Sequence, residues 1–340
     1  MKRLGFLCGV VAVLLLCHPT NAMATVVCTD DALSDAASAL LVDASELSPG
    51  NIAVAVRHAG SDAPTAHAIR VAVDRDAEIE AWLASVRARS DAPVGCGRAA
   101  NASHQVVVAR ELAGSLSVVS NSQPVQYRVA LRAPYRNARV VLLDARLEPH
   151  EIPIRNDASS LYVEVPSEFR SAYLLQLSAD GPHGPKPVAE RLVGTLPTVA
   201  VGALPVQRPE LVIDRLNAAR ERLQQRPLRA NRVLMEAAEQ HARSVCEVGL
   251  VAHTLEVGAN PEERLRARGL VARIVGESIA RASDASRAFD AMLGSPVHAA
   301  TLNDARFTDV GTGAAQDLHQ RTCLVVLLAG WPRMVPPGSD

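Results

Sequence analysis

The chain has 340 residues, 48% of them hydrophobic and 21% charged, so it can bury a sizeable core and is not a disordered protein. Its length allows two or three domains, and with only 3% aromatic residues we expect a core of Ala, Val and Leu. The formal net charge of −1 gives no overall field that would attract a polyanion, which argues against nucleic acid as the main partner.

The N-terminus has the order of a secretory signal peptide. Two basic residues precede an apolar run from Leu4 to Cys17, and a small-residue cleavage pattern ends at Ala24. The run is too short to span a bilayer. We therefore predict that residues 1–24 are removed near Ala24. We also predict a mature protein without a transmembrane segment, secreted or periplasmic.

Four cysteines remain after this leader: Cys28, Cys96, Cys246 and Cys323. In an oxidising compartment they allow three pairings. The gap between Cys96 and Cys246 is the largest, so pairing within each half, Cys28 with Cys96 and Cys246 with Cys323, is the simplest expectation. Their spacing is not that of a structural zinc knuckle.

Residues 25–103 carry mixed signals that predict a small α/β or mostly helical domain. Apolar residues recur at helical spacing from Leu33 to Leu41 and from Ile79 to Val86. Between these segments, Ile52–Arg57 and Ala68–Val73 have the pattern of short strands.

In residues 104–197 the apolar period changes to two, and turn formers separate short runs, which predicts an antiparallel β-sandwich, immunoglobulin-like. The predicted strands include Gln105–Ala109, Gln126–Leu131, Val140–Asp144, Leu161–Val165, Ala172–Ser178 and Val188–Val193. Domains of this kind usually bind a partner or act as a spacer between other domains, and they seldom catalyse a reaction. A proline-marked linker, residues 198–208, follows.

Residues 209–335 return to helical spacing. An apolar stripe runs from Val233 to Val245, with Asn231 as its predicted N-cap and an end near Gly249. His241 lies on this stripe, so we expect a buried, hydrogen-bonded core histidine rather than a ligand.

Five short segments follow one another in this region. They are His253 in a loop, Gly276–Ala280, Ser295–Leu302, Phe307–Gly313 and the apolar run Cys323–Ala329. In this order they resemble the bacterial branch of the CAP superfamily, which groups cysteine-rich secretory proteins, antigen 5 and pathogenesis-related proteins. The resemblance covers about Pro209 to Pro332 and implies an α-β-α sandwich.

The resemblance also implies a cleft that binds zinc or another divalent ion in some members. Carried over by motif, His253, Glu277 and His298 are the candidate metal ligands. The sequence departs from the family pattern at several places: Ser278 replaces Asn, Met292 replaces Trp, Ala299 replaces Arg, Thr301 replaces Asn, and Ser295 lies near the place of the second glutamate.

The residues themselves allow two interpretations of this group. Two neutral imidazoles and one carboxylate can hold a divalent ion and leave a position open for water. Ser295 and Pro296 form a helix start, with Ser295 as cap, which places His298 in a first turn where the helix dipole disfavours imidazolium. Alternatively, Glu277 accepts hydrogen bonds from both histidines and the three form a buried polar network without any ion.

We expect a multidomain α+β protein that is exported and binds rather than catalyses, because the sequence contains no recognised catalytic motif. The preferred hypothesis is a binding or envelope-associated module that recognises a lipid, glycan or protein through the CAP cleft. One alternative is a metal-dependent hydrolase with Glu277 as its catalytic residue. The other is a structural or adhesive surface protein whose cleft is silent.

Overall fold

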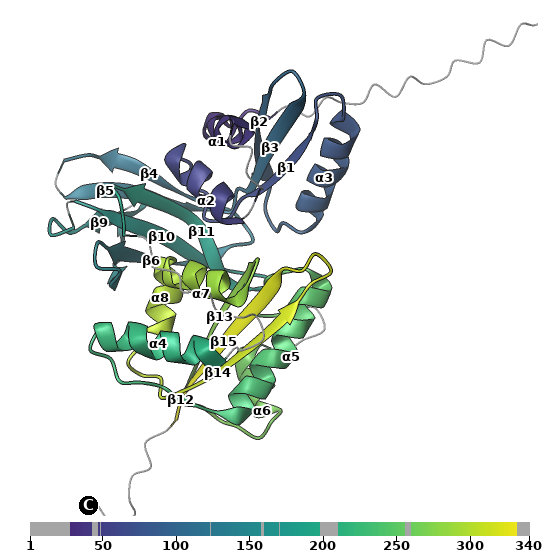
Figure 1. The fold of residues 1–340 in the computed structure, drawn as a ribbon. Coiled ribbons are helices and arrows are strands. Elements are labelled where there is room, and N and C mark those ends of the chain that lie inside the picture. Colours follow the sequence, from purple (N-terminus) through teal and green to yellow (C-terminus); the bar gives the residue numbers. More distant parts are fainter. Residues whose placement is uncertain are drawn as a thin grey trace, which may run out of the picture.

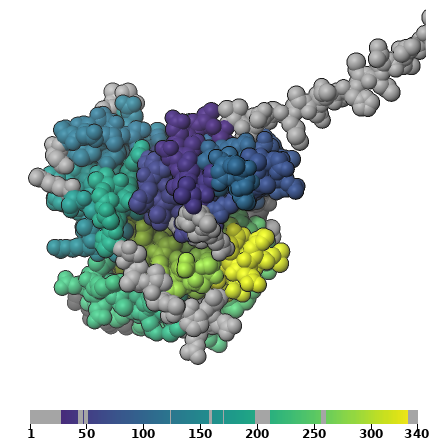
Figure 2. All heavy atoms as spheres, turned by 45° about the horizontal axis from the view of Figure 1, so that its top comes forward, coloured from purple at the N-terminus to yellow at the C-terminus, as the bar shows by residue number. Residues whose placement is uncertain are grey.

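The computed structural model describes residues 28–42, 47, 49–122, 124–157, 160–169, 171–197, 210–255 and 260–331. The predicted signal peptide and the predicted linker lie outside these ranges. The sheets define three regions: an N-terminal region (28–111), a sheet pair (114–193) and a C-terminal region (210–331), shown in Figure 1. The three regions pack against one another, as the space-filling view shows (Figure 2).

The N-terminal region is an α/β unit, and its disulfide is the expected one, Cys28 with Cys96. Its elements are α1 (Asp31–Val42), α2 (Pro49–His58), β1 (His67–Ala72), α3 (Asp76–Ala88), β2 (Val94–Ala100) and β3 (His104–Glu111). The three strands form an antiparallel sheet in the order β1-β3-β2. Alternate residues of β3 enter one core with α1 and α2 and another with α3, so this strand is buried on both faces.

Two sequence predictions for strands fail in this region. Ile52–Arg57 is not a strand but part of helix α2. Ile52, Ala55 and Val56 are buried at helical spacing against α1, whereas Val54 is 55% exposed. The predicted strand Gln105–Ala109 exists, but it pairs with β1 and β2 rather than with the strands of the sheet pair.

The sheet pair consists of two four-stranded antiparallel sheets, β11-β10-β6-β7 and β4-β5-β9-β8, that share one apolar core. The strands are β4 (Gly114–Ser120), β5 (Val125–Leu131), β6 (Arg136–Asp144), β7 (Pro149–Ile152), β8 (Ile154–Asp157), β9 (Ser160–Val165), β10 (Tyr173–Gly181) and β11 (Gly184–Val193). Face-to-face packing of two sheets is the arrangement that the period of two favours. The immunoglobulin-like connectivity stays a prediction.

The C-terminal region has a central sheet, β12-β14-β15-β13, between two helical layers. Its elements are α4 (Glu210–Arg222), β12 (Arg229–Ala230), α5 (Arg232–Val248), α6 (Pro261–Arg266), β13 (Ile274–Ala282), α7 (Ala285–Leu293), α8 (Pro296–Leu302), β14 (Asp309–Gln316) and β15 (Thr322–Gly330). Alternate residues of β15 pack toward α5 on one face and toward α4 and α7 on the other. This is the three-layer arrangement that the resemblance implies.

Helix α5 is fixed at both ends and along its length. The Asn231 side chain accepts hydrogen bonds from two backbone N–H groups of the first turn, as predicted, and Gly249 ends the helix in a left-handed conformation. Gly313 of β14 lies so close that a Cβ there would be 2.1 Å from the nitrogen of Glu239. The second expected disulfide, Cys246 with Cys323, joins α5 to β15.

Within the described part of the chain, none of the helices combines the length and apolar character needed to cross a membrane.

Candidate functional site

Glu277, on the edge strand β13, lies at the centre of a buried polar group in the C-terminal region. Its side chain is only 1% exposed. Its Oε1 atom is 2.9 Å from Nδ1 of His253, and because a carboxylate only accepts, the imidazole donates from Nδ1. The structure thus brings two of the three predicted site residues into direct contact.

Arg264 of helix α6 occupies the other side of this carboxylate. Its guanidinium is bonded to Oε2 of Glu277 and also donates from Nη1 to the backbone carbonyl of His253, at 2.9 Å. Helix α6 begins with a complete capping box between Asn260 and Glu263, which fixes the turn that carries Arg264. The sequence motifs do not indicate Arg264, although Asn260 and Pro261 are a recognisable helix start.

His241 completes this group, which we call the Glu277 cluster: Glu277, His253, Arg264 and His241. His241 is 4% exposed and donates from Nε2 to the carbonyl of Ala252, so it is the hydrogen-bonded core histidine that the stripe predicts. The same Nε2 lies 3.8 Å from Oε1 of Glu277. Burial lowers the pKa of His241, which keeps the imidazole neutral at pH 7.

The carboxylate of Glu277 stays ionised in this setting. Burial alone would raise the pKa of Glu277, but the hydrogen bond from His253 and the charge of Arg264 outweigh burial and lower it. The negative charge of Glu277 therefore lies directly beside the positive charge of Arg264.

His298, the third predicted site residue, is on α8, in the first turn as expected, and is partly buried. Burial, with a contribution from His253, lowers the pKa of His298 from 6.5 to about 4. His298 is therefore neutral at pH 7.

A hairpin of the sheet pair covers the cluster on the side of His253. The backbone N–H groups of His253 and Thr254 donate to the carbonyl of His183 at 3.0 and 3.1 Å. At Gly184, φ is +101° and a Cβ would be 2.8 Å from the Cβ of His253, so this position requires glycine. The turn between β10 and β11 is thus fitted against the predicted site.

The start of α8 is also held by the sheet pair. Gln176 of β10 accepts through Oε1 from the Ser295 hydroxyl at 2.8 Å and from the backbone nitrogen of Val297 at 3.2 Å. Ser295 occupies the N-cap position of α8, as predicted, but its hydroxyl makes no hydrogen bond to the backbone N–H groups of the helix, so that part of the prediction is wrong. Gln176 supplies the acceptor instead, and no local sequence pattern indicates it.

Glu277, one of the three predicted metal ligands, is engaged by protein donors in this arrangement. Both oxygens of Glu277 are already hydrogen-bonded, and one of them is bound to a cation. In the described part of the chain, three side chains at another place, Asp144, Glu148 and His150, bring their ligand atoms within 4.8 Å of one another. The metal-binding role of His253, Glu277 and His298 stays a prediction.

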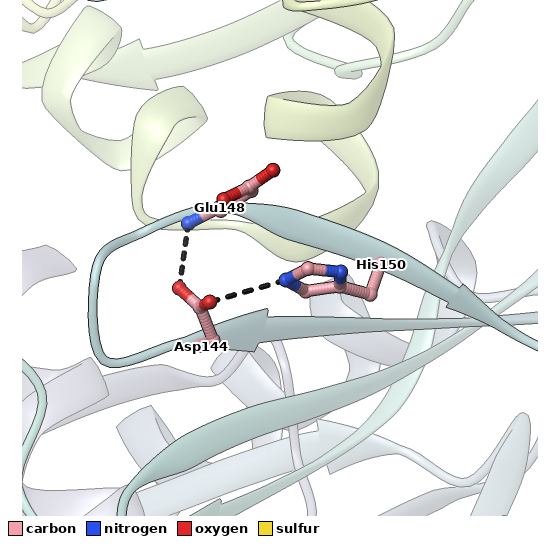
Figure 3. A group of neighbouring side chains, drawn as sticks. All are labelled: Asp144, Glu148 and His150. Carbon is pink, nitrogen blue, oxygen red and sulfur yellow. Dashed lines mark hydrogen bonds and ion pairs between the residues drawn. The ribbon is translucent and has the colours of Figure 1, made fainter. Parts of the chain in front are cut away.

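That other group is Asp144, Glu148 and His150, at the turn between β6 and β7 (Figure 3). Asp144 accepts through Oδ1 from the backbone nitrogens of Arg146 and Glu148, at 2.8 and 2.9 Å, and its Oδ2 is 3.1 Å from Nε2 of His150. These contacts are those of a side chain that stabilises a tight turn. The three side chains form an acidic and imidazole group near the surface. Nothing else in the described contacts of this turn points to a ligand.

The match to a protein family concerns the C-terminal region. The sequence pattern of the cysteine-rich secretory protein family, CAP, matches residues 213–328. None of the curated proteins matches the chain.

Three solved structures show distant likeness. An outer surface protein of Borrelia burgdorferi is 19% identical, with a TM-score of 0.35, over 39% of this chain and 100% of its own. An extracellular SCP-domain protein of Bacillus anthracis is 16% identical, with a TM-score of 0.34, over 65% of this chain and 83% of its own. A cysteine-rich secretory protein of Staphylococcus aureus is 11% identical, with a TM-score of 0.30, over 65% and 81%.

The sequence match coincides with the three-layer region that holds the Glu277 cluster. The C-terminal region of this chain, residues 213–328, is therefore a domain of the cysteine-rich secretory protein (CAP) family.

Proposed function

We propose that the protein is an exported binding module, associated with the cell envelope, that recognises a lipid, glycan or protein through the CAP domain without hydrolysing it. The observation that carries this proposal is the state of Glu277: both of its oxygens are engaged. A general base or a water-activating ligand needs a carboxylate oxygen within reach of the reacting proton. The Glu277 carboxylate has a protein donor on each oxygen and is 1% exposed, so a substrate arriving from solvent does not reach it.

The position of the cluster supports the same reading. The β10–β11 hairpin lies against His253, and the His253 side chain is 16% exposed. A ligand can therefore reach the edge of His253 but not the carboxylate behind it. Recognition at this edge requires no chemistry from Glu277.

Export is supported by the cysteines. All four cysteines of the predicted mature chain form disulfides, Cys28 with Cys96 and Cys246 with Cys323. Disulfides persist in oxidising compartments outside the cytoplasm.

The test uses the full mature chain in two assays. The first measures sedimentation with vesicles of phosphatidylethanolamine and phosphatidylglycerol, with purified peptidoglycan and with envelope protein fractions. The second measures ester and peptide hydrolysis, with and without zinc. We expect saturable binding to one fraction and no turnover.

The matched variants are His253→Ala, at the edge of the cluster, and His319→Ala, at an exposed residue of the β14–β15 turn. We expect the first to weaken binding at least about tenfold, which is about 1.4 kcal/mol, and the second to leave it unchanged. Turnover that disappears in Glu277→Ala would establish the hydrolase instead. Binding to none of the fractions would leave the structural or adhesive role.

A further inference from the structure

We infer that Arg264 is the resident cation of the Glu277 cluster and takes the place that a divalent ion would have, so that the native CAP domain is metal-free. The inference is independent of which ligand the protein recognises. It rests on the contacts of Arg264, on the charge balance around Glu277 and on the burial of both side chains.

The contacts show that Arg264 performs the bridging task of an ion. It binds Oε2 of Glu277 on β13 and the carbonyl of His253 in the preceding loop, so one guanidinium on α6 joins the loop before this helix to the strand after it. A guanidinium has five donors in a fixed fork, which suits this double contact. The Arg264 side chain is 11% exposed, so the bridge is held within the fold rather than at the surface.

The charge of Arg264 opposes the binding of a further cation at Glu277. Arg264 places its positive charge directly on an oxygen of Glu277, and the two side chains are 11% and 1% exposed. A zinc ion added here would place two more positive charges in a buried site beside a guanidinium. The desolvation of unbalanced charge in a protein interior is costly, so binding would require Arg264 to leave.

The hydrogen bond of His253 completes the set of protein donors to Glu277. His253 donates from Nδ1 to Glu277, so each oxygen of the carboxylate has a protein donor, one from His253 and one from Arg264. An ion that bound Glu277 would have to share the carboxylate with both donors, one of them a guanidinium, at a side chain that is 1% exposed. The polar side chains satisfy one another, which removes the need for a metal.

The experiment titrates zinc alone into the full mature chain and follows binding by calorimetry and the unfolding temperature by circular dichroism. The variants are Arg264→Met, Arg264→Met combined with Glu277→Gln, and Arg266→Met as a control at an exposed arginine of the same helix. We expect no saturable binding at Glu277 in the wild type or in Arg266→Met. We expect Arg264→Met to gain one zinc site, at least about tenfold tighter than any in the wild type, which the added Glu277→Gln removes.

Arg264→Lys covers the case in which Arg264→Met does not fold. Arg264→Lys keeps the positive charge, so we expect it to fold and to have no affinity for zinc. If Arg264→Met does not fold by itself, we expect added zinc to restore its folding. The inference is overturned if the wild type binds one equivalent of zinc that Glu277→Gln abolishes. It is equally overturned if Arg264→Met gains no zinc affinity and no stability from zinc.

Discussion

The Glu277 cluster and the Asp144 turn both contain carboxylates and imidazoles, but the negative charge of the carboxylate is stabilised by different partners in the two places. Glu277 is buried and is balanced by Arg264, a charged partner from another segment. Asp144 lies at a surface turn and is satisfied largely by backbone N–H groups of its own turn. Burial, rather than the type of residue, decides whether an acid needs a cation of its own, because an unpaired buried charge loses its hydration.

Removing the buried cation should have the largest effect. Arg264→Met leaves Glu277 buried without a charged partner, and we expect it to lower the free energy of unfolding by about 3–5 kcal/mol in urea denaturation at pH 7. Arg266→Met, at an exposed site of the same helix, should change it by less than about 0.5 kcal/mol. Equal effects of the two substitutions would show that the Glu277–Arg264 pair is not special.

Acid should weaken the buried region next. The pKa of His298 is lowered from 6.5 to about 4, so the fold favours the neutral imidazole. This contribution is fully present above about pH 6.5 and is lost as the pH falls through about 4, because the unfolded chain binds the proton first.

Urea denaturation at pH values between about 4 and 8 measures this slope. His298→Asn should flatten the slope, and His319→Asn, at an exposed site, should not. The pKa of Glu277 is also lowered, so its ionised form stabilises the fold and this stability is lost at lower pH. Glu277 therefore accounts for part of the slope that remains in His298→Asn. A slope that is identical in the wild type and in His298→Asn would contradict the assignment.

A third buried polar contact tests whether the same reasoning holds between regions. Gln176 is 2% exposed, receives hydrogen bonds from the start of α8 and donates to Glu190 at 3.0 Å. Gln176→Leu keeps the volume but leaves these groups without their partner, which should cost about 1–3 kcal/mol. Amide hydrogen exchange should rise at Val297, and exchange unchanged there would show that Gln176 does not hold α8.

The Asp144 turn should respond least. Asp144→Ala removes the acceptor of two backbone N–H groups near the surface, with an expected loss of about 1 kcal/mol, and Glu148→Ala should stay within about 0.5 kcal/mol. Both are measured by urea denaturation with and without zinc. A zinc-dependent stabilisation that Asp144→Ala abolishes would show that this turn, unlike our account of it, is a metal site.

The parts of the fold that local patterns control could be predicted from the sequence. They include helix α5 with its Asn231 cap and the apolar strand β15. The two disulfides followed from the spacing of the four cysteines along the chain. Ile52–Arg57 was misleading because alternating β-branched residues and alanines favour a strand, while packing against α1 selects the helical face. Tertiary contact decided that segment.

The candidate site could be predicted only in part, for the same reason. Short motifs identified His253 and Glu277, which are in contact, and the helical stripe identified His241 as a core residue. Arg264 and Gln176 could not be found, because an arginine on a short helix and a glutamine in a strand resemble surface residues until the partner segment covers them. Long-range partners of buried polar groups leave no local signal.

The most direct test of the central claim is the metal content of the wild-type protein, purified without chelators from cells grown with added zinc and measured by elemental analysis. Our account predicts far less than one equivalent of zinc or any other divalent metal per chain. One equivalent of metal in the wild type, absent from Glu277→Gln prepared in parallel, would contradict it.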